Sequence, residues 1–485
     1  MRLVVFHYHD RPGGVRQVIT RGLPPLVERC GNVGEVVLLL GEQTDPAWAR
    51  ELAASLNGLP LRCVVHPDFG YLSGREQVLG RDAGKLLDRV LSGRAGLCWA
   101  HNLSVGRNIP LLRMLPDRCA AAGVRLWLHH HDWWWDGRWA RWADWQAAGV
   151  DGLGQALGCS VPTGPHLRHW CVNGEDLNWL QQAAGGAAQW VGNPLPDPVL
   201  PDKNEIRQAA AWLREKAGGR RVWLAPVRAL RRKNLAEALL LVQQQRSLGE
   251  KVCLVTTGGP SSPAEVPAWH TFCQTAARHH WPLVPGVLAA SSGTRSGGPG
   301  PRVAALIAVS DAIIMTSLQE GFGLPYLEAA FLNKPLLARA LPGVQANLAA
   351  LGCTLPGAYS FLPVERDPCP GAGGKALPPE APGQWLRLLP AELTAGWEET
   401  GGSPWVDFGQ LPLTAQLDVM ARGSRPAGAL PQPGVPGWPH ACRIDHWADR
   451  FFQTPDPPAA ASGSSLLPEV RRRFQYWLRH PLLWP

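Results

Sequence analysis

The sequence lacks several features that would assign it to whole classes of protein. Its 11 cysteines are odd in number, scattered, and include no CxxC pair, which excludes an obvious disulfide framework and favours a reduced, cytoplasmic compartment. No run approaches the ~18 apolar residues that a membrane-spanning helix needs. The first residues have the pattern of a strand, not of a signal segment. Because RNP motifs, zinc-finger spacings and basic-region helices are also absent, nucleic-acid binding is not predicted.

Charge is sparse as well. Charged residues make up 18% of the 485 residues and hydrophobic residues 45%, which describes a folded chain with more than one core and not a disordered one. The formal net charge of +8 is dispersed along the chain. It favours anionic ligands or anionic membrane surfaces as partners.

The stretch Val309–Pro335 combines a strand, a glycine loop and a helix. Its apolar run Ala312–Met315 predicts a buried strand, and EGFGLPYLE follows after a short polar loop. Pro325 suits the first position of a helix, which we expect to cover Tyr326–Leu332. Because the first amide groups of a helix have no acceptors within it, an anion fits best above this loop.

Two carboxylates flank the glycine loop: Glu320 precedes it, and Glu328 lies about one turn into the helix. An ordinary strand-to-helix junction is one interpretation. The stretch also resembles the donor-binding segment of retaining glycosyltransferases of the GT-B type, particularly family 4, in which two glutamates frame the nucleotide sugar. The resemblance implies that Glu320 faces the sugar and that Glu328 holds the ribose hydroxyls. It further implies that sugar and phosphate meet the backbone of Gly321, Phe322, Gly323 and Leu324.

The start of the chain predicts a sheet of the nucleotide-binding kind. Arg2–His7 reads as a strand, Gly13 and Gly14 as a tight turn, and Val15–Leu23 as a helix that Pro24–Pro25 interrupts. A glycine turn between first strand and first helix has the geometry that cradles phosphates. In the resembled family a similar turn faces the donor phosphates and the acceptor.

Further strands are expected at Glu35–Leu40, Leu61–Val65 and Gly96–Ala100, with a helix at Gln77–Leu91. Alternating strands and helices predict a parallel, doubly wound sheet. The ligands of such a sheet bind beyond the carboxyl ends of its strands.

Histidines gather at two such strand ends. His101 and Asn102 follow one strand, and the triplet His129, His130, His131 follows another. The triplet suggests a metal, but neighbouring residues of a strand point to opposite faces, so at most two of the three can share one ion. A structural role, with the imidazoles hydrogen-bonded beneath the following tryptophans, is a second interpretation.

A third interpretation is preferred. His131–Asp132 resembles the His-Asn or His-Asp pair of family 4 enzymes, whose histidine lies near the transferred sugar; His130 is the second choice for that position. Trp190–Pro198 then resembles the Asn-Pro segment that leads out of the first domain, and its prolines suit a linker.

A basic loop follows the first strand of the second domain. Four basic residues lie between the expected strand Arg221–Val227 and the expected helix Asn234–Gln243: Arg228, Arg231, Arg232 and Lys233. Some of the four are expected simply to lie on a solvated surface. A diphosphate requires fixed positive charge. The loop resembles the family's Arg-then-Lys pair that grips the donor diphosphate, with Arg228 and Lys233 at the matching positions.

The remaining strands of this domain are expected at Lys251–Thr257 and Leu283–Val287. We expect Thr257 and Gly258 to approach the nucleotide, and Leu283–Val287 to lie where the family holds the base. Ser291–Arg302 reads as a flexible insertion.

The part of the chain after residue 350 is less regular. Residues 353–440 are rich in proline and glycine and carry one expected helix, Leu413–Met420. No task is assigned to them. The basic segment SLLPEVRRRFQYWLRHPLLWP predicts an amphipathic helix that packs on the first domain or, alternatively, contacts an anionic membrane.

The prediction is an α/β protein of GT-B type, with two Rossmann-like, doubly wound parallel sheets facing across a cleft. The expected domains are residues 1–196 on the acceptor side, 197–352 binding the nucleotide sugar, the irregular extension 353–440, and the helical tail 441–485. The resemblance implies a retaining hexosyltransferase that needs no cofactor or metal and acts on a sugar, lipid-linked or small-molecule acceptor. The alternatives are a non-catalytic nucleotide-sugar-binding protein and a GT-B epimerase or hydrolase.

Overall fold

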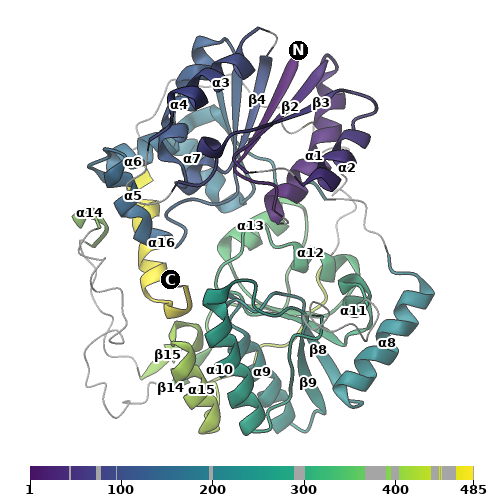
Figure 1. The fold of residues 1–485 in the computed structure, drawn as a ribbon. Helices are drawn as coiled ribbons and strands as arrows, with labels where there is room; N and C mark the ends of the chain where they lie inside the picture. Colours follow the sequence, from purple (N-terminus) through teal and green to yellow (C-terminus); the bar gives the residue numbers. More distant parts are fainter. Residues whose placement is uncertain are drawn as a thin grey trace. The chain divides into compact units, whose positions relative to one another are not determined.

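The computed structural model divides the chain into two compact units (Figure 1). Unit 1 lies within Met1–Asp197, Pro382–Trp397 and Cys442–Gln475, and unit 2 within Pro198–Ala381, Glu398–Ala441 and Tyr476–Pro485. The structure describes residues 1–11, 13–42, 45–72, 78–93, 95–195, 200–288, 301–365, 389–394, 404–437, 447, 449 and 466–483.

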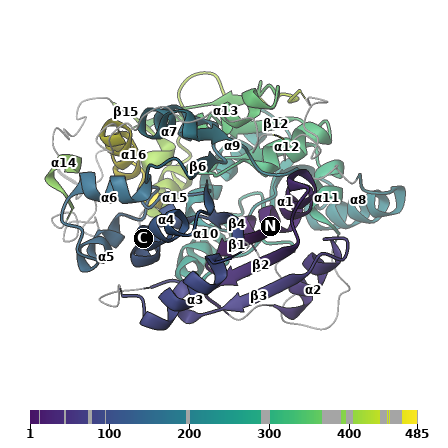
Figure 2. The same cartoon turned by 90° about the horizontal axis from the view of Figure 1, so that it is seen from above.

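Unit 1 is built on a sheet of seven parallel strands in the order β3-β2-β1-β4-β5-β6-β7. The strands are β1 (Arg2–His7), β2 (Glu35–Leu40), β3 (Leu61–Val65), β4 (Ala95–His101), β5 (Arg125–His130), β6 (Leu167–Cys171) and β7 (Ala188–Trp190). The chain runs outward from β1 to β3 and returns beside β1 with β4, so the order reverses between β1 and β4. Figure 2 shows β4, β1, β2 and β3 side by side. Ligands of doubly wound sheets bind at this reversal.

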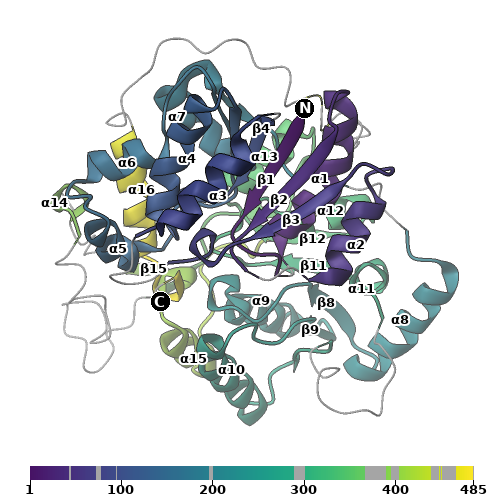
Figure 3. The same ribbon diagram turned by 45° about the horizontal axis from the view of Figure 1, so that its top comes forward.

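Helices cover both faces of this sheet. Figure 3 shows α1 and α2 to one side of strands β1–β3, and α3 and α4 to the other. The helices of unit 1 are α1 (Gly14–Cys30), α2 (Pro46–Ala54), α3 (Arg81–Leu91), α4 (Ile109–Ala121), α5 (Trp142–Ala147), α6 (Leu153–Ser160), α7 (Gly174–Ala184), α14 (Ala391–Thr394) and the part of α16 (Leu467–Leu478) up to Gln475. Because both faces are covered, the inner strands β1 and β2 are almost continuously apolar, as the sequence indicated.

Two helix predictions in unit 1 are wrong. The helix expected to stop at Pro24–Pro25 continues to Cys30. Each proline removes one helix hydrogen bond, at a cost of about 3 kcal/mol, but Leu23 and Leu26 on this segment are fully buried and their packing keeps the helix continuous. The helix expected from Gln77 begins at Arg81; Gln77 itself lies outside the described residues.

A residue far along the chain completes the core of unit 1. Trp447 is 2% exposed and packs with Leu23, Leu26 and Trp99 in one apolar cluster. Its ring lies so close to α1 that a Cβ on Gly22 would come within 2.4 Å of it. Its indole N–H donates to the carbonyl of Gly192 at 3.2 Å. A side chain at position 22 would therefore displace this tryptophan.

Unit 2 contains a six-stranded parallel sheet in the order β10-β9-β8-β11-β12-β13. Its strands are β8 (Arg221–Ala225), β9 (Val252–Thr256), β10 (Leu283–Val284), β11 (Ala312–Met315), β12 (Leu336–Arg339) and β13 (Ala358–Tyr359). The order reverses between β8 and β11. The fold-class prediction is confirmed: the protein is α/β, with two Rossmann-like, doubly wound parallel sheets.

The helices of unit 2 are α8 (Lys203–Ala217), α9 (Leu235–Ser247), α10 (Val266–Arg278), α11 (Val303–Val309), α12 (Leu324–Phe331), α13 (Pro342–Ala350) and α15 (Leu413–Ala421). In Figure 1, α9, α10 and α15 lie together, as do α8, α11 and α12. Most of the expected insertion Ser291–Arg302 lies outside the described residues. None of the described helices is both long enough and apolar enough to cross a bilayer.

Part of the proline- and glycine-rich region packs into unit 2. A short antiparallel pair, β14 (Pro363–Glu365) and β15 (Trp405–Asp407), places Asp407 beside Arg339 at the end of β12. Arg339 donates to Asp407 at 2.7 Å and to Glu237 of α9 at 2.6 Å, and all three side chains are at least 96% buried. Breaking such a buried pair costs about 3–5 kcal/mol. The segment around Asp407 is therefore integral to the core of unit 2.

Candidate functional site

Two oppositely charged side chains meet at the reversal point of the unit 2 sheet. Lys233 follows β8, Glu320 follows the neighbouring strand β11, and the Lys233 ammonium donates to Glu320 Oε1. Both side chains are 9% exposed. Arg232 joins them: its guanidinium donates to the carbonyl of Gln319 at 2.7 Å and lies 3.9 Å from Glu320 Oε2. Sequence patterns alone suggested both loops, and the fold brings them together.

The backbone of the two loops explains this pairing. The Thr316 hydroxyl lies 3.1 Å from the carbonyl of Lys233 and 2.9 Å from that of Asn234, and the Leu318 amide donates to the carbonyl of Arg232 at 2.9 Å. The loop after β11 is thereby fastened to the loop after β8. Burial lowers the pKa of Lys233, and the adjacent Glu320 opposes this shift. The pair is thus a fixed, largely desolvated ammonium–carboxylate contact.

The glycine loop between β11 and α12 depends on glycine at one position. Gly323 has φ +91, and a Cβ there would lie 2.8 Å from Val344, so the position suits glycine. The carbonyl of Phe322 accepts from Asn347 at 3.0 Å. Helix α12 begins at Leu324, two residues before the expected start. Among the described residues, no acceptor meets the N–H groups of Gly321, Phe322, Gly323 or Leu324. This helix start can therefore bind an anion.

The other predicted donor-binding residues of unit 2 occupy two kinds of position. Arg228 and Glu328 are exposed. Thr257 and Gly258 instead support the Arg228 loop, since the Gly258 amide donates to the carbonyl of Val227 at 3.1 Å. A Cβ on Gly258 would lie 2.8 Å from the Arg228 Cα. Any larger residue at 258 would therefore shift Arg228.

The reversal point of the unit 1 sheet lies between β1 and β4. Gly13 and Gly14 follow β1, at the start of α1, and His101 ends β4. His101 Nδ1 lies 3.1 Å from Nε2 of His131, the residue after β5. Asn102, which follows His101 with φ +61, accepts through Oδ1 from the amide of His131 at 3.2 Å.

Burial keeps these imidazoles neutral. It lowers the pKa of His131 to about 4 and holds the pKa values of His101 and His129 well below the usual range. His131 is partly exposed, whereas His130 is buried beneath Trp133, with ring centroids 4.2 Å apart. Of the two candidates in the triplet, His131 is the one within reach of solvent.

Ligand atoms of His101, His129 and His131 lie within 4.8 Å of one another, a spacing compatible with a metal ion. His101 was not expected from the sequence to join this group. The tautomer of His129 does not fit a metal ligand, however. The Trp99 indole, which can only donate, points its N–H at His129 Nδ1 over 3.3 Å. A neutral His129 therefore carries its proton on Nε2, so the group is better described as hydrogen-bonded imidazoles.

Sequence reasoning missed several residues that shape both sites. Arg232 was treated as one cation of a basic run, but its contact with Gln319 requires the β8–β11 pairing. His169 of β6 contacts His130 Nε2 at 2.9 Å. Arg473, within the basic run of the C-terminal helix, pairs with Asp136 and Asp176. Arg473 differs from the two arginines before it only in being more buried, and the burial of a side chain can be known only from the folded structure.

Comparison with known proteins finds glycosyltransferase-like proteins. No family model matches the chain. The mannosylglucosyl-3-phosphoglycerate synthase of Petrotoga mobilis is 24% identical over 369 residues, which span 71% of this chain and 66% of that relative, less than two thirds of its length.

Among solved structures, Anabaena Alr3699/HepE in complex with UDP is 15% identical and covers 71% of this chain and 82% of its own, with a TM-score of 0.47. WaaG, a glycosyltransferase involved in lipopolysaccharide biosynthesis, is 14% identical, covers 74% and 85%, and has a TM-score of 0.44.

Proposed function

We propose that the protein is a glycosyltransferase that moves a sugar from a nucleotide-sugar donor to an acceptor with retention of anomeric configuration, in the manner of family 4. The observation that carries the proposal is the buried Lys233–Glu320 pair at the strand-order reversal of unit 2, beside the start of α12. The curated synthase relative supports it, since its name describes a glycosylated product.

The charges of this site suit a departing nucleoside diphosphate. In the proposal Arg228 and Lys233 bind the diphosphate, and the N–H groups of Gly321–Leu324 add backbone donors at a helix N-terminus. These groups are fixed before the reaction, so they stabilise the charge on the leaving group without reorganising. Because they supply the positive charge themselves, no metal ion is required by the proposed mechanism.

The two glutamates have different environments, which suits different roles. Glu320 is buried against Lys233, and we assign it to the sugar, where a carboxylate stabilises the positive charge that develops as the glycosidic bond breaks. Glu328 is exposed, one turn into α12, and we assign it to the ribose hydroxyls.

Unit 1 is assigned to the acceptor side and to the transferred sugar. His131 is neutral at physiological pH because burial lowers its pKa to about 4. A neutral imidazole can bind a sugar hydroxyl without opposing the positive charge that develops on the sugar. Gly13 and Gly14 place no side chain at the start of α1, which suits close approach of a substrate.

A thermal-shift screen against UDP-, GDP-, ADP- and dTDP-sugars tests the proposal. A bound donor at 100 times its dissociation constant stabilises the protein by about 2.7 kcal/mol. Glucose and mannose nucleotides come first, because both sugars occur in the name of the curated relative. Turnover of the selected donor is then measured with and without candidate acceptors, and the anomeric configuration of the product is determined by NMR.

Three outcomes argue against the proposal. Absence of a shift with every nucleotide sugar contradicts donor binding. Binding without turnover, across sugar, lipid-linked and small-molecule acceptors, favours a non-catalytic binder. Turnover that is as fast without acceptor favours an epimerase or hydrolase.

A further inference from the structure

The loop that follows β5 carries His131 at its start and continues through Asp132–Arg138. Its backbone is tied down at several points. The Trp133 amide donates to Asp136 Oδ2 at 2.9 Å, the Trp134 amide donates to the carbonyl of Ser104 at 3.0 Å, and Arg138 donates to the carbonyl of Trp133 at 2.9 Å. The shape of this loop therefore depends on where Asp136 and Trp133 are held.

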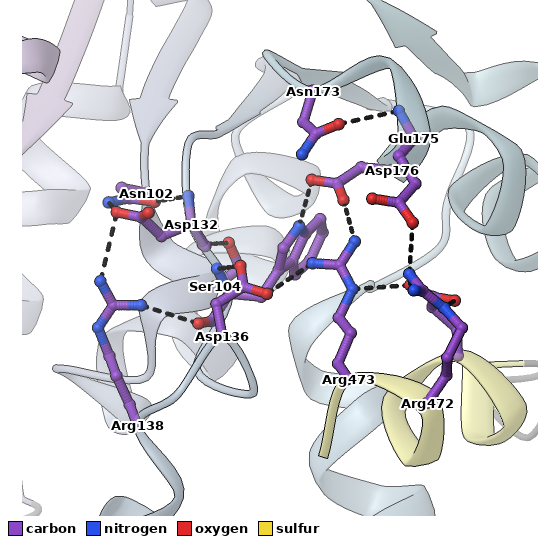
Figure 4. Close-up of polar contacts among 12 residues, drawn as sticks. Asn102, Ser104, Asp132, Asp136, Arg138, Asn173, Glu175, Asp176, Arg472 and Arg473 are labelled. Carbon is purple, nitrogen blue, oxygen red and sulfur yellow. Dashed lines mark hydrogen bonds and ion pairs between the residues drawn. The ribbon is translucent and has the colours of Figure 1, made fainter. Parts of the chain in front are cut away.

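Arg473 of α16 binds Asp136 directly and reaches Trp133 through Asp176. Figure 4 shows its guanidinium reaching from α16 toward Asp136 of the loop and Asp176 of α7. It donates to Asp136 Oδ1 at 2.5 Å, to Asp176 Oδ1, and through Nε to Glu469 Oε1 at 2.7 Å. The Arg473 side chain is 13% exposed and that of Asp176 is 3% exposed. These charge-assisted bonds are hence shielded from water.

The contact to Asp176 extends to the histidines. The other oxygen of Asp176, Oδ2, accepts from the Trp133 indole at 2.9 Å. The Trp133 ring in turn stacks on His130, at an interplanar angle of 21°. A continuous series of contacts thus leads from Arg473 through Asp176 and Trp133 to the residue before His131.

Three carboxylates share this guanidinium, and its two terminal nitrogens bind Asp136 and Asp176. Asp136 and Asp176 belong to different elements, and a planar fork can bind one with each terminal nitrogen at a fixed separation, whereas a lysine ammonium offers a single point charge. The neighbouring Arg472 is different. It pairs with Glu175 and Glu469 at the surface, with its side chain 49% exposed.

We propose that Arg473 is a positioning residue for the transfer reaction: it fixes the loop Asp132–Arg138 and thereby the orientation of His131. The link to the reaction rests on the proposed function, in which His131 lies near the transferred sugar. The link between Arg473 and the shape of the loop does not depend on that function.

The test compares Arg473→Gln and Arg473→Lys with the matched control Arg472→Gln in the full chain. Hydrogen exchange reports the loop directly, because the amides of Trp133 and Trp134 are both hydrogen-bonded. In Arg473→Gln we expect exchange in the peptide that covers these amides to rise at least tenfold, with little change in peptides from α3 or from unit 2. Arg473→Lys should lie between the wild type and Arg473→Gln, and Arg472→Gln should match the wild type.

Steady-state kinetics supply the second measurement. Arg473→Gln should lower kcat about tenfold or more while leaving the affinity for free nucleoside diphosphate unchanged, because the diphosphate groups belong to unit 2. Arg473→Lys should recover part of kcat.

Unchanged exchange in the loop overturns the proposal, and so does faster exchange throughout unit 1, which indicates a purely structural ion pair. If Arg473→Gln does not fold, the same comparisons are made with Arg473→Lys. Altered loop exchange with normal kcat also overturns the positioning role. If the wild type transfers no sugar, the proposed function fails, while the exchange measurement still decides whether Arg473 sets the loop.

Discussion

Replacing His169 should reduce the sensitivity of unit 1 to acid. His169 lies in β6 with no exposed surface. Its Nε2 contacts the carbonyl of Pro162 at 2.8 Å. A carbonyl only accepts, so Nε2 carries the proton and Nδ1 must accept from His130 Nε2, 2.9 Å away. Neutral His130 then accepts at Nδ1 from the Ser104 hydroxyl, 2.8 Å away. A second proton, on His169 Nδ1, would place that N–H directly opposite the Nε2–H of His130, and the hydrogen bond between them would be lost.

The size of this pH effect on stability follows from the pKa of His169. Burial lowers the pKa of His169 from 6.5 to about 4. Above pH 6.5 the imidazole is neutral in both the folded and the unfolded protein. As the pH falls below 6.5 only the unfolded chain takes up the proton, so the free energy of unfolding decreases. Between pH 7 and pH 5 this single group lowers that free energy by about 2 kcal/mol.

Asp176 changes the free energy of unfolding in the opposite direction between pH 7 and pH 5. Burial raises its pKa to about 6, so the folded protein takes up this proton first and gains roughly 1 kcal/mol between pH 7 and pH 5. The contribution is common to the wild type and to a His169 variant. It therefore cancels when the two are compared.

The assay is urea unfolding of the wild type and His169→Asn at pH 7 and pH 5, followed by tryptophan fluorescence. The variant should be less stable at pH 7, because one buried hydrogen bond is lost, at a cost of about 1–3 kcal/mol. It should lose about 2 kcal/mol less than the wild type on going to pH 5. His166→Asn is the control, since His166 also contacts a carbonyl, that of Pro116 at 3.0 Å, but is only partly buried. An equal loss in wild type and His169→Asn refutes the reasoning.

Three further predictions concern the proposed donor site. Lys233→Ala should weaken binding of the donor and of free nucleoside diphosphate about 10- to 100-fold, which corresponds to the loss of one charged hydrogen bond, as measured by titration calorimetry. The control Lys216→Ala, at an exposed position, should bind both ligands normally. Unchanged affinity in Lys233→Ala contradicts the phosphate role. Glu320→Gln should lower kcat with little effect on nucleotide affinity, whereas Glu328→Gln should mainly raise the donor KM; a KM-only defect in both variants would make Glu320 a binding residue. Transfer activity should survive EDTA, and activity lost to EDTA and restored by Mn²⁺ or Mg²⁺ would favour metal binding by the histidines.

The sequence predicted several strands well because buried parallel strands are nearly uninterrupted apolar runs. Arg2–His7, Glu35–Leu40 and Ala312–Met315 have the predicted bounds, and so does the partly exposed edge strand Leu61–Val65. Local rules failed where packing outweighed them, as at Pro24–Pro25 in α1. A rule based on single residues gives the free-energy cost of a proline inside a helix. It does not give the stabilisation from the buried leucines beside that proline.

The candidate site was predictable in part for a related reason. Lys233 and Glu320 each follow an apolar run, and the ligands of a parallel sheet bind beyond the carboxyl ends of its strands, so each loop could be predicted to bind a ligand. The direct ion pair between them depends on β8 and β11 being neighbours. The pairing of His101 with His131 depends likewise on β4 lying beside β5. Strand order is a property of the whole sheet, and no local pattern encodes it.

The Arg473 contacts also constrain the order in which the chain can fold during synthesis. Arg473 lies 297 residues after Asp176. At about 5–20 residues per second, a ribosome needs roughly 15–60 s to add that length. Throughout this interval Asp136 and Asp176 lack the cation that they share in the finished protein, and burying both would leave their charges uncompensated. The nascent first unit therefore stays incomplete until nearly all of the second has been synthesised, because only Tyr476–Pro485 of unit 2 follows Arg473 in the chain.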